Sequence, residues 1–593
     1  MLILGIHDGH DATAALLIDG RVVACASNER WSRLKNDGSF PCQAIDHVLS
    51  VANIRPHEID MVALSTKSRD PIRTKTNRIA CFKKEDFIRE MHEYWRPLLY
   101  ENTETDYWRR LIEEPAFKDN NKLYDVGFLK TAPKKKWAEL FNEERIRVIV
   151  DYLGVSREKV SIIDHHTTHA YYAYFASPRD YSRKSAIVTA DGWGDGCNAT
   201  VSIGENGVVR EIHRTPMCNI ARIYRWITLL LGMRPHEHEY KVMGLAPYSK
   251  KYIYEPVYNI LKETLVVDGL DFKWNEKPQD MYFYFRKKFE GFRFDGIACG
   301  LQLWLEDLLT EWMTNIMAHT SAQALYYSGG LSLNIKANKA ISELSSVRDF
   351  HVPPGSGDAS TAIGAAYFLS VKSGSKAFPL ENAYLGYEPT REEAAKATET
   401  FKNDPAYRVI DSPDADLLAS LLADGKVLAR CVGRMEFGPR ALGNRSIICD
   451  PSKYENIRVI NEKIKLRDFW MPFTPSILHE RARDYILNPK GLFSHYMTIA
   501  FSGTQLARRE LAAAIHPYDF TVRPQLVTSE INGEYYSLIK AFERKTGIGA
   551  LLNTSFNLHG EPIVCTPGEA VETFKNSGLD GVILPDVAVL KSG

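Results

Sequence analysis

Short apolar runs alternate with polar, turn-forming residues along most of the chain. Two apolar runs lie at 2–6 and 15–18, and the second is followed by Asp19-Gly20 and a third run at 21–26. Two short apolar runs joined by Asp-Gly are typical of a β-hairpin. The pattern therefore predicts that the chain opens with a hairpin, as many α/β proteins do.

Residues 83–153 have a different pattern. This segment is rich in Glu, Lys, Arg, Trp and Tyr and poor in Gly, and its apolar residues have helical spacing. We interpret it as a helical insertion and as a candidate lid or homodimer surface. Its charges are expected to form solvated faces.

Apolar runs return after the insertion, and a polar motif follows each of them directly. These predicted strands lie at 160–163, 186–189, 324–327 and 349–352. Functional side chains at strand ends are the usual arrangement in α/β enzymes. A Lys/Ser/Gly stretch at 372–376 is the best linker candidate. We therefore expect two domains, 1–372 and 378–593, and the sequence shows no long-period repeat.

Length and composition narrow the functional classes. A chain of 593 residues is too long for one hydrophobic core. Lys plus Arg and Asp plus Glu each number 74, so the net charge is zero, which argues against nucleic-acid or anionic-membrane partners. The nine cysteines are scattered singly, which favours a reducing cytoplasm. The apolar start is too short for a signal peptide, and no stretch reaches the roughly 20 apolar residues of a membrane helix.

The motif His165-His166-Thr167-Thr168-His169 is the strongest single chemical signal. On a helix, His165 and His169 project from the same face, so both rings could reach one metal ion. Asp191 and Asp358, each at a predicted strand end, are candidates to complete the site. Two imidazoles with carboxylates suit Fe(II), Mn(II) or Zn(II). The alternative is a polar helix start capped by Asp164.

Three glycine-containing turns follow predicted strands, at 191–196, 328–330 and 355–358. Each by itself is a common turn. Together they describe an actin-like nucleotide cleft, in which separate glycine turns hold the phosphates and the nucleoside.

The second domain contains a turn-rich stretch with three arginines at 433–446, followed by further cationic residues and by the polar strand end 551–557. Guanidinium groups suit phosphate and carboxylate oxygens. Apolar residues within the stretch indicate that it packs, which argues against an ordinary salt-bridged surface loop.

These motifs together resemble the NodU/CmcH family of O-carbamoyltransferases, whose members act on tobramycin, cephalosporins, ansamycins, nodulation factors and saxitoxin-type toxins. The resemblance runs nearly end to end. Its most specific parts are EYKVMGLAPY at 239–248, the stretch 434–446, and NTSFN followed by GEP within 553–562.

The resemblance implies an α/β protein with two catalytic units. The N-terminal unit would be actin-like, similar to the universal tRNA threonylcarbamoyl transferases, and the C-terminal unit would be YrdC-like. The C-terminal unit would convert carbamoyl phosphate and ATP into carbamoyl-adenylate, and the N-terminal unit would transfer the carbamoyl group to a hydroxyl of a small natural-product acceptor. The implied cofactors are ATP, Mg²⁺, and Fe²⁺ or another divalent metal.

The resemblance also implies a role for each candidate residue. The catalytic base would be His10, with Asp8 nearby, and the metal ligands would be His165, His169, Asp191 and Asp358. The N-terminal nucleotide site would comprise Gly192, Gly194, Lys241, Gly244, Ser328, Gly329, Gly330 and Asn334. Carbamoyl phosphate and ATP would bind Arg434, Arg440, Arg445, Lys465, Arg467, Arg523, Asn553, Ser555 and Asn557.

Two departures from the family pattern stand out. Asn28 replaces a glutamate found in many members, and the spacing before Arg523 is altered. The alternative functions are a tRNA threonylcarbamoyl-type modification enzyme, which the zero net charge disfavours, and a nucleotide-binding regulator without activity, which the intact metal ligands and arginines disfavour. The insertion lies where members differ, so we expect it to help select the acceptor. Acceptor, metal and oligomeric state are not identified by the sequence.

Overall fold

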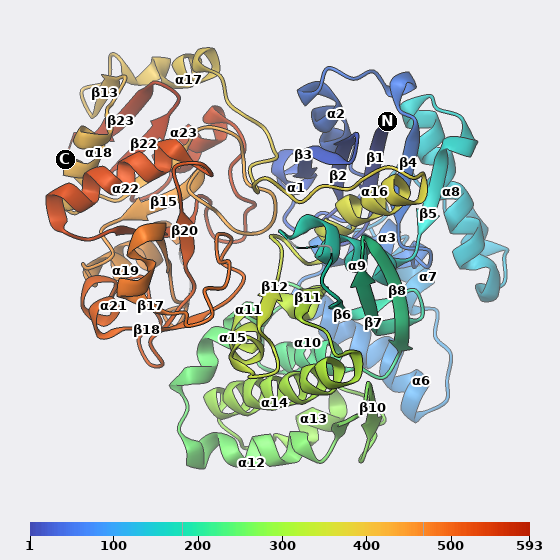
Figure 1. Ribbon diagram of the computed structural model, residues 1–593. Helices are drawn as coiled ribbons and strands as arrows, with labels where there is room; N and C mark the ends of the chain where they lie inside the picture. The colour runs from blue at the N-terminus through green and yellow to red at the C-terminus, as the bar shows by residue number, and fades with distance from the viewer. Residues whose placement is uncertain (179, 181, 466–467, 593) are drawn as a thin grey trace. The chain divides into compact units, whose positions relative to one another are not determined.

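The computed structural model describes residues 1–178, 180, 182–465 and 468–592, and the chain divides into two compact units (Figure 1). Unit 1 consists of Met1–Ser32 and Asn36–Leu380, and unit 2 consists of Arg33–Lys35 and Glu381–Gly593. The chain passes from the first unit to the second after Leu380, shortly beyond the predicted linker at 372–376.

Unit 1 contains two five-stranded sheets. The strands of the first are β1 (Leu2–His7), β2 (Thr13–Ile18), β3 (Arg21–Ser27), β4 (Met61–Ser65) and β5 (Val160–Ile163). Their order is β3-β2-β1-β4-β5, with antiparallel pairing among the first three and parallel pairing of β4 with β1 and with β5. Asp19 and Gly20 join β2 to β3, and both have positive φ, as a two-residue hairpin turn requires. The predicted hairpin is confirmed.

The second sheet repeats this topology. Its strands are β6 (Ser185–Gly194), β7 (Cys197–Glu205), β8 (Val208–Thr215), β11 (Ala324–Ser328) and β12 (Asp349–His351). They are ordered β12-β11-β6-β7-β8, with β6, β7 and β8 antiparallel and with β11 parallel to both β6 and β12. Unit 1 is therefore built from two copies of one supersecondary arrangement, although the sequence shows no repeat. This is the mixed α/β architecture expected of an actin-like domain.

Two helices pack together between the sheets, and each follows the fifth strand of its copy. Helix α9 (His165–Ala176) follows β5, and α16 (Thr361–Lys372) follows β12. The backbones approach closely because Gly364 of α16 has no side chain. A Cβ there would overlap the carbonyl oxygen of Thr168 and lie 2.7 Å from its carbon. This crossing fixes the start of α9 near the strand ends of the second sheet.

The segment 83–153 is largely helical, and its two ends belong to different cores. Phe87 and Tyr107 join a cluster with Leu229 and Tyr282, whereas residues of α8 join the core under the first sheet. Helices in and beside this segment are α3 (Pro71–Lys75), α4 (Arg78–Cys81), α5 (Lys84–Glu90), α6 (Arg96–Tyr100), α7 (Tyr107–Leu111) and α8 (Trp137–Leu153).

The remaining elements of unit 1 include α14 (Phe294–Thr320), against which several of the others pack. They are α1 (Glu29–Ser32), α2 (Cys42–Val51), α10 (Ile220–Leu230), α11 (Glu239–Leu245), α12 (Lys251–Lys262), α13 (Phe283–Lys288), α14 (Phe294–Thr320), α15 (Ile335–Glu343) and the hairpin of β9 (Leu265–Asp268) and β10 (Asp271–Trp274). Among the described residues, no helix combines the length and apolar character needed to cross a membrane.

Unit 2 is built on a mixed eight-stranded sheet ordered β13-β23-β22-β14-β15-β21-β16-β20. These strands are β13 (Tyr407–Asp411), β14 (Leu428–Cys431), β15 (Arg445–Cys449), β16 (Thr474–Leu478), β20 (Gln525–Val527), β21 (Ala550–Ser555), β22 (Gly581–Leu584) and β23 (Val587–Lys591). A small sheet contains β17 (Ile486–Leu487), β18 (Phe501–Gly503) and β19 (Thr521–Val522).

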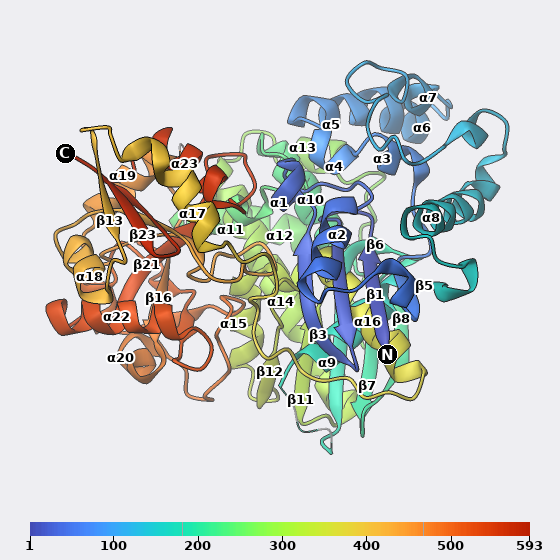
Figure 2. The same cartoon turned by 90° about the horizontal axis from the view of Figure 1, so that it is seen from above.

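The helices of unit 2 pack against this sheet, against the small sheet or against one another. They are α17 (Arg391–Thr398), α18 (Ala415–Ala423), α19 (Glu455–Val459), α20 (Ala482–Tyr485), α21 (Gln505–Glu510), α22 (Gly533–Thr546) and α23 (Pro567–Lys575). Helices α18 and α22 lie side by side (Figures 1 and 2). Phe574 of α23 belongs to the core that also contains Ile447 and Leu552.

Candidate functional site

The four predicted metal ligands come together in unit 1. Each of His165, His169, Asp191 and Asp358 offers one donor atom, and these atoms lie within 4.8 Å of one another. Nε2 of His169 is 3.3 Å from Asp191 Oδ2 and 3.6 Å from Asp358 Oδ1, and Nε2 of His165 is 3.7 and 3.8 Å from the same two atoms. Asp164 also caps α9, since its side chain accepts from the backbone N–H of Thr167 at 3.0 Å.

Hydroxyl groups orient both imidazoles through the ring nitrogen that does not face the carboxylates. Nδ1 of His165 is 3.0 Å from Thr66 Oγ1, and Nδ1 of His169 is 3.2 Å from Ser328 Oγ. Both Nε2 atoms are buried and have no hydrogen-bond partner. Buried polar atoms are normally satisfied, and metal-bound histidines are normally held through their other nitrogen. The donor set therefore fits a divalent metal ion.

Glycine turns make room for this cluster. A Cβ on Gly194 would overlap the ring of His165 and lie 2.8 Å from its Nε2. The backbone N–H of Gly330 donates to Asp191 Oδ2 at 3.0 Å, and that of Gly192 donates to Oδ1 at 2.5 Å. Residues expected to hold a nucleotide thus also shape the candidate metal site.

In this cluster, burial and the neighbouring charges shift the pKa values in opposite directions. Burial raises the pKa of Asp191, but the adjacent imidazoles of His165 and His169 outweigh it and bring the pKa well below its usual value. Burial lowers the pKa of His169, yet the two carboxylates raise it to about 9. A site that draws a proton onto an imidazole in this way is one that a cation would stabilise.

Asp8 is fully engaged with cationic and hydroxyl groups. Arg145 donates to both of its carboxylate oxygens at 2.7 Å, and Tyr124 donates at 2.8 Å. Burial raises the pKa of Asp8, but Arg145 and then Arg69 outweigh it, so the pKa is far below its usual value. His10 pairs with the carboxylate of Asp11, whose Oδ1 is 3.7 Å from Nε2. Sequence reasoning missed this pair and the Asp8–Arg145 pair.

The other residues predicted to bind a nucleotide differ in their contacts and burial. Asn334 caps α15 and exchanges hydrogen bonds with Gln302 at 2.9 and 3.0 Å. Lys241 and Gly244 are buried in α11. Gly329 has a φ of 100°, and a Cβ there would overlap the carbonyl oxygen of Ala190.

In unit 2, three predicted ligands meet. Lys465 donates to the backbone oxygen of Ser555, to its Oγ at 3.1 Å, and to Asn557 Oδ1 at 2.6 Å. Asn553 points elsewhere from the same strand, because its amide donates to Ala441 O at 3.1 Å and Ser476 Oγ at 2.9 Å.

The arginines of the 433–446 stretch differ from one another. The guanidinium of Arg445 is fully buried and donates to several backbone oxygens, among them Val432 O at 2.9 Å and Cys565 O at 3.1 Å. Arg434 donates to Leu385 O at 2.9 Å. These contacts hold the surrounding backbone in place. Arg440 and Arg523 are half-buried, and Arg467 lies outside the described residues.

A buried glutamate that was not predicted organises the same stretch. Oε1 of Glu436 accepts from the backbone N–H groups of Leu442, Asn444 and Arg445 at 2.7, 2.8 and 3.1 Å. In the sequence, the only sign of this role was that Glu436 is an acidic residue within an arginine-rich turn.

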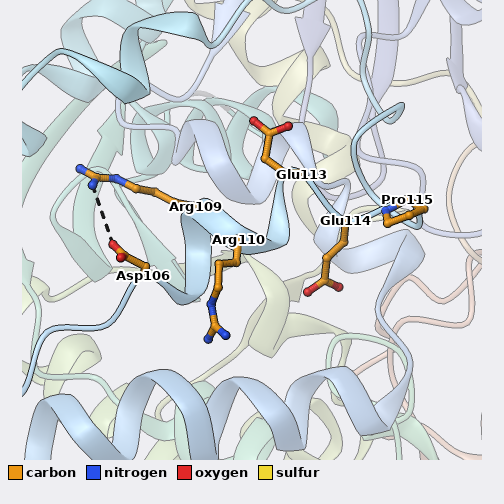
Figure 3. A pocket seen from close by; sticks show the side chains of 6 residues that line it. All are labelled: Asp106, Arg109, Arg110, Glu113, Glu114 and Pro115. Carbon is orange, nitrogen blue, oxygen red and sulfur yellow. Dashed lines mark ion pairs between the residues drawn. The ribbon is translucent and has the colours of Figure 1, made fainter.

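A surface hollow beside α7 carries no comparable chemistry (Figure 3). Its lining side chains are Asp106, Arg109, Arg110, Glu113, Glu114 and Pro115. Asp106 and Arg109 pair at 3.8 Å and are mostly exposed. This is the solvated charged face expected of the insertion.

Comparison with known proteins decides the family. Residues 2–367 match the family described as carbamoyltransferase N-terminus, and residues 419–591 match carbamoyltransferase C-terminus. The chain belongs to the carbamoyltransferase family. An uncharacterized protein of Synechocystis is 30% identical over 98% of this chain and 95% of its own length. Nodulation protein NolNO of Sinorhizobium fredii is 28% identical over 98% of this carbamoyltransferase-family chain and 79% of its own length.

Similarity to solved structures is weak. Component A of (R)-2-hydroxyglutaryl-CoA dehydratase from Acidaminococcus fermentans covers 63% of this chain and aligns over 100% of its own, with 13% identity and a TM-score of 0.34. A similarity at this level does not bear on function.

Proposed function

We propose that this member of the carbamoyltransferase family is an ATP-dependent O-carbamoyltransferase. Unit 2, as a YrdC-like domain, would form carbamoyl-adenylate, and the actin-like unit 1 would transfer its carbamoyl group to a hydroxyl of a small-molecule acceptor. The observation that carries the proposal is the cluster of His165, His169, Asp191 and Asp358, in which both imidazole Nε2 atoms are buried and have no hydrogen-bond partner.

The proposed reaction balances in three steps. Carbamoyl phosphate and water give carbamate and phosphate. The carbamate oxygen then attacks the α-phosphorus of ATP, which forms carbamoyl-adenylate and releases pyrophosphate. Finally the acceptor oxygen attacks the carbamoyl carbon, the bond to the AMP oxygen breaks, and the products are the O-carbamoyl compound and AMP. A mixed anhydride supplies the leaving group that carbamate lacks, and exclusion of water would protect it from hydrolysis.

In unit 1, His10 is the proposed base for the acceptor hydroxyl. Burial lowers its pKa, but Asp11, Asp358 and Asp191 together raise it. With the charges of Asp191 and Asp358 compensated by a divalent cation, His10 would be held less strongly in its protonated form and could accept the proton. A divalent ion held by the four ligands would supply Lewis acidity toward the adenylate. Fe²⁺ is the metal we propose.

In unit 2, Lys465 with Ser555 and Asn557 is the proposed binding site for the phosphate of carbamoyl phosphate. The lysine is buried, and an anion could replace the neutral oxygen atoms that it contacts. Arg440 and Arg523 are half-buried and are proposed to contribute to the same site. We propose that Mg²⁺ is bound to the ATP. We assign Arg445 and Arg434 to holding the backbone.

The test is pyrophosphate release by the full chain with ATP and Mg²⁺, with and without carbamoyl phosphate. We expect release that requires carbamoyl phosphate. Lys465→Met should raise the KM for carbamoyl phosphate, because the one buried cation of the cluster is removed. Lys402→Met, an exposed lysine of the same unit that pairs with Glu399 at 2.7 Å, is the matched control.

Two results would contradict the proposal. The first is the absence of pyrophosphate release from folded, metal-loaded protein. The second is equal KM values for Lys465→Met and Lys402→Met, which would remove the phosphate site from the Lys465 cluster.

A further inference from the structure

Helix α10 presents two arginines toward the candidate metal centre. Arg222 and Arg225 are three residues apart, so they lie on the same side of the helix. A Cβ on Gly192 would overlap Nη2 of Arg225 and lie 3.3 Å from its Cζ. The Arg225 guanidinium therefore lies against the residue that follows the metal ligand Asp191.

Neither guanidinium is neutralised by a close carboxylate. Among the described residues, Arg225 has no hydrogen bond or ion pair, and Arg222 donates only to the amide oxygen of Asn219, at 3.3 Å. Both side chains are half-buried. Burial, together with the charges of Arg78 and Arg222, lowers the pKa of Arg225 to about 10, although Glu239 and Asp191 oppose the shift.

The surroundings add positive charge. Arg78 is paired with the buried Glu90 at 2.6 Å, and Arg73 lies 3.6 Å from Asp70. Burial and then Arg225 keep the pKa of His236 well below its usual value, so this neighbour of His10 stays neutral. Glu239, whose pKa is raised by burial, is the acid that faces Arg225. Two half-buried guanidinium groups without close counter-ions are costly unless an anion joins them.

An exposed aromatic side chain lies beside Arg222, and α10 also packs against the insertion. The Arg222 guanidinium lies 5.8 Å from the ring of Trp193, which is 52% exposed. Leu229, further along α10, packs in the cluster with Phe87 and Tyr107. Helix α10 thus contacts both the surroundings of the candidate metal centre and the segment expected to select the acceptor.

We propose that Arg222 and Arg225 form an oxyanion subsite that binds a carboxylate, phosphate or sulfate group of the acceptor. The substrate would therefore be an anionic hydroxyl compound. This assignment rests on the proposed carbamoyl transfer. The planar guanidinium matches such groups in bidentate fashion, and binding would relieve the repulsion between the two arginines. The phosphate of the adenylate has the same chemistry, so the experiment must separate the two sources.

The first test is residue-resolved modification of the full chain by phenylglyoxal, followed by mass spectrometry. The probe is inorganic sulfate, compared with chloride at equal ionic strength. We expect sulfate to slow modification of Arg222 and Arg225, but not of Arg110, which is exposed on α7. Equal rates in sulfate and chloride would overturn the subsite.

A second arm uses AMP. If sulfate still protects both arginines when AMP is saturating, the subsite is separate from the nucleotide phosphate, as proposed. If AMP alone protects them and sulfate then adds nothing, the anion is the nucleotide phosphate and the assignment to the acceptor is wrong.

The third arm identifies the product. The enzyme is given labelled carbamoyl phosphate, ATP and a deproteinised extract of its host, and the labelled product is applied to an anion-exchange column. We expect it to be retained, and we expect Arg225→Gln to raise the KM for the purified acceptor about tenfold or more. Arg157→Gln, at an exposed arginine outside the insertion, should not raise it. A labelled product that is neutral or cationic overturns the proposal. Absence of pyrophosphate release would instead refute the proposed function, and the sulfate result would still decide whether the subsite exists.

Discussion

Gly194 allows the candidate metal centre to be tested without changing a ligand. Its φ lies outside the left-handed region, so alanine suits the backbone and the effect of Gly194→Ala is steric. The new methyl group would lie 2.8 Å from Nε2 of His165 and closer still to two ring carbons, whereas ordinary contact begins at 3.4 Å. The His165 ring must therefore move by more than about 0.6 Å at its donor atom.

That displacement exceeds what a metal site tolerates, because ligand distances hold to about 0.2 Å. The ring also cannot retreat freely, since Nδ1 is 3.0 Å from Thr66 Oγ1. Disturbing an orienting neighbour costs about 10- to 100-fold in metal affinity, and we expect the upper end here, about 2.7 kcal/mol. Overpacking the site should also lower the free energy of unfolding by about 1–3 kcal/mol.

The assay is Fe²⁺ or Zn²⁺ binding by chelator competition, with urea unfolding measured on the same samples. Gly533→Ala is the matched control, because a Cβ there meets nothing within 4 Å. Folded Gly194→Ala protein that binds metal as tightly as the wild type would refute the reasoning. An equal loss of metal affinity in Gly533→Ala would refute it as well.

Further predictions concern buried charges. Removing one partner of the Asp8–Arg145 pair, by Asp8→Asn or Arg145→Met, should lower the free energy of unfolding by about 3–5 kcal/mol, as measured in urea. A loss below about 1 kcal/mol would contradict this. Because folding lowers the pKa of Asp8, its stabilisation is present above about pH 4 and lost as pH falls toward the folded-state pKa, so Asp8→Asn should flatten the acid limb of the stability curve. Arg445→Lys should lower Tm and leave the KM for carbamoyl phosphate unchanged; a higher KM at constant Tm would restore Arg445 to the phosphate site. Glu436→Ala should destabilise by about 2 kcal/mol or more and Glu436→Gln by less, since glutamine keeps an oxygen acceptor for the three N–H groups.

Features set by local spacing could be predicted from the sequence. The Asp19-Gly20 turn specifies a hairpin, because both residues tolerate positive φ. The four-residue spacing of His165 and His169 places them on one helix face in any context. Asp191 and Asp358 were inferred from their positions at strand ends, and the structure brings all four donor atoms together.

Features set by distant partners could not be predicted. Asp8 and Arg145 are 137 positions apart, and the sequence gives no sign that α8 delivers this guanidinium to the end of β1. Arg445 illustrates a second difficulty. An arginine in a turn looks the same in sequence whether it faces phosphate or backbone oxygens, because both are acceptors for its N–H groups. Only packing distinguishes the two roles.

The duplication of unit 1 explains why two similar motifs have different roles. Asp8-Gly9 follows the central strand of the first sheet, and Asp191-Gly192 stands at the corresponding point of the second. The local chain therefore delivers a carboxylate to the same place in each copy. Arg145 of α8 neutralises Asp8, whereas Asp191 meets two imidazoles from α9. The chemistry of each aspartate is thus determined by the helix that reaches it, and a metal ion has a candidate site in only one of these two positions because a guanidinium already compensates the other.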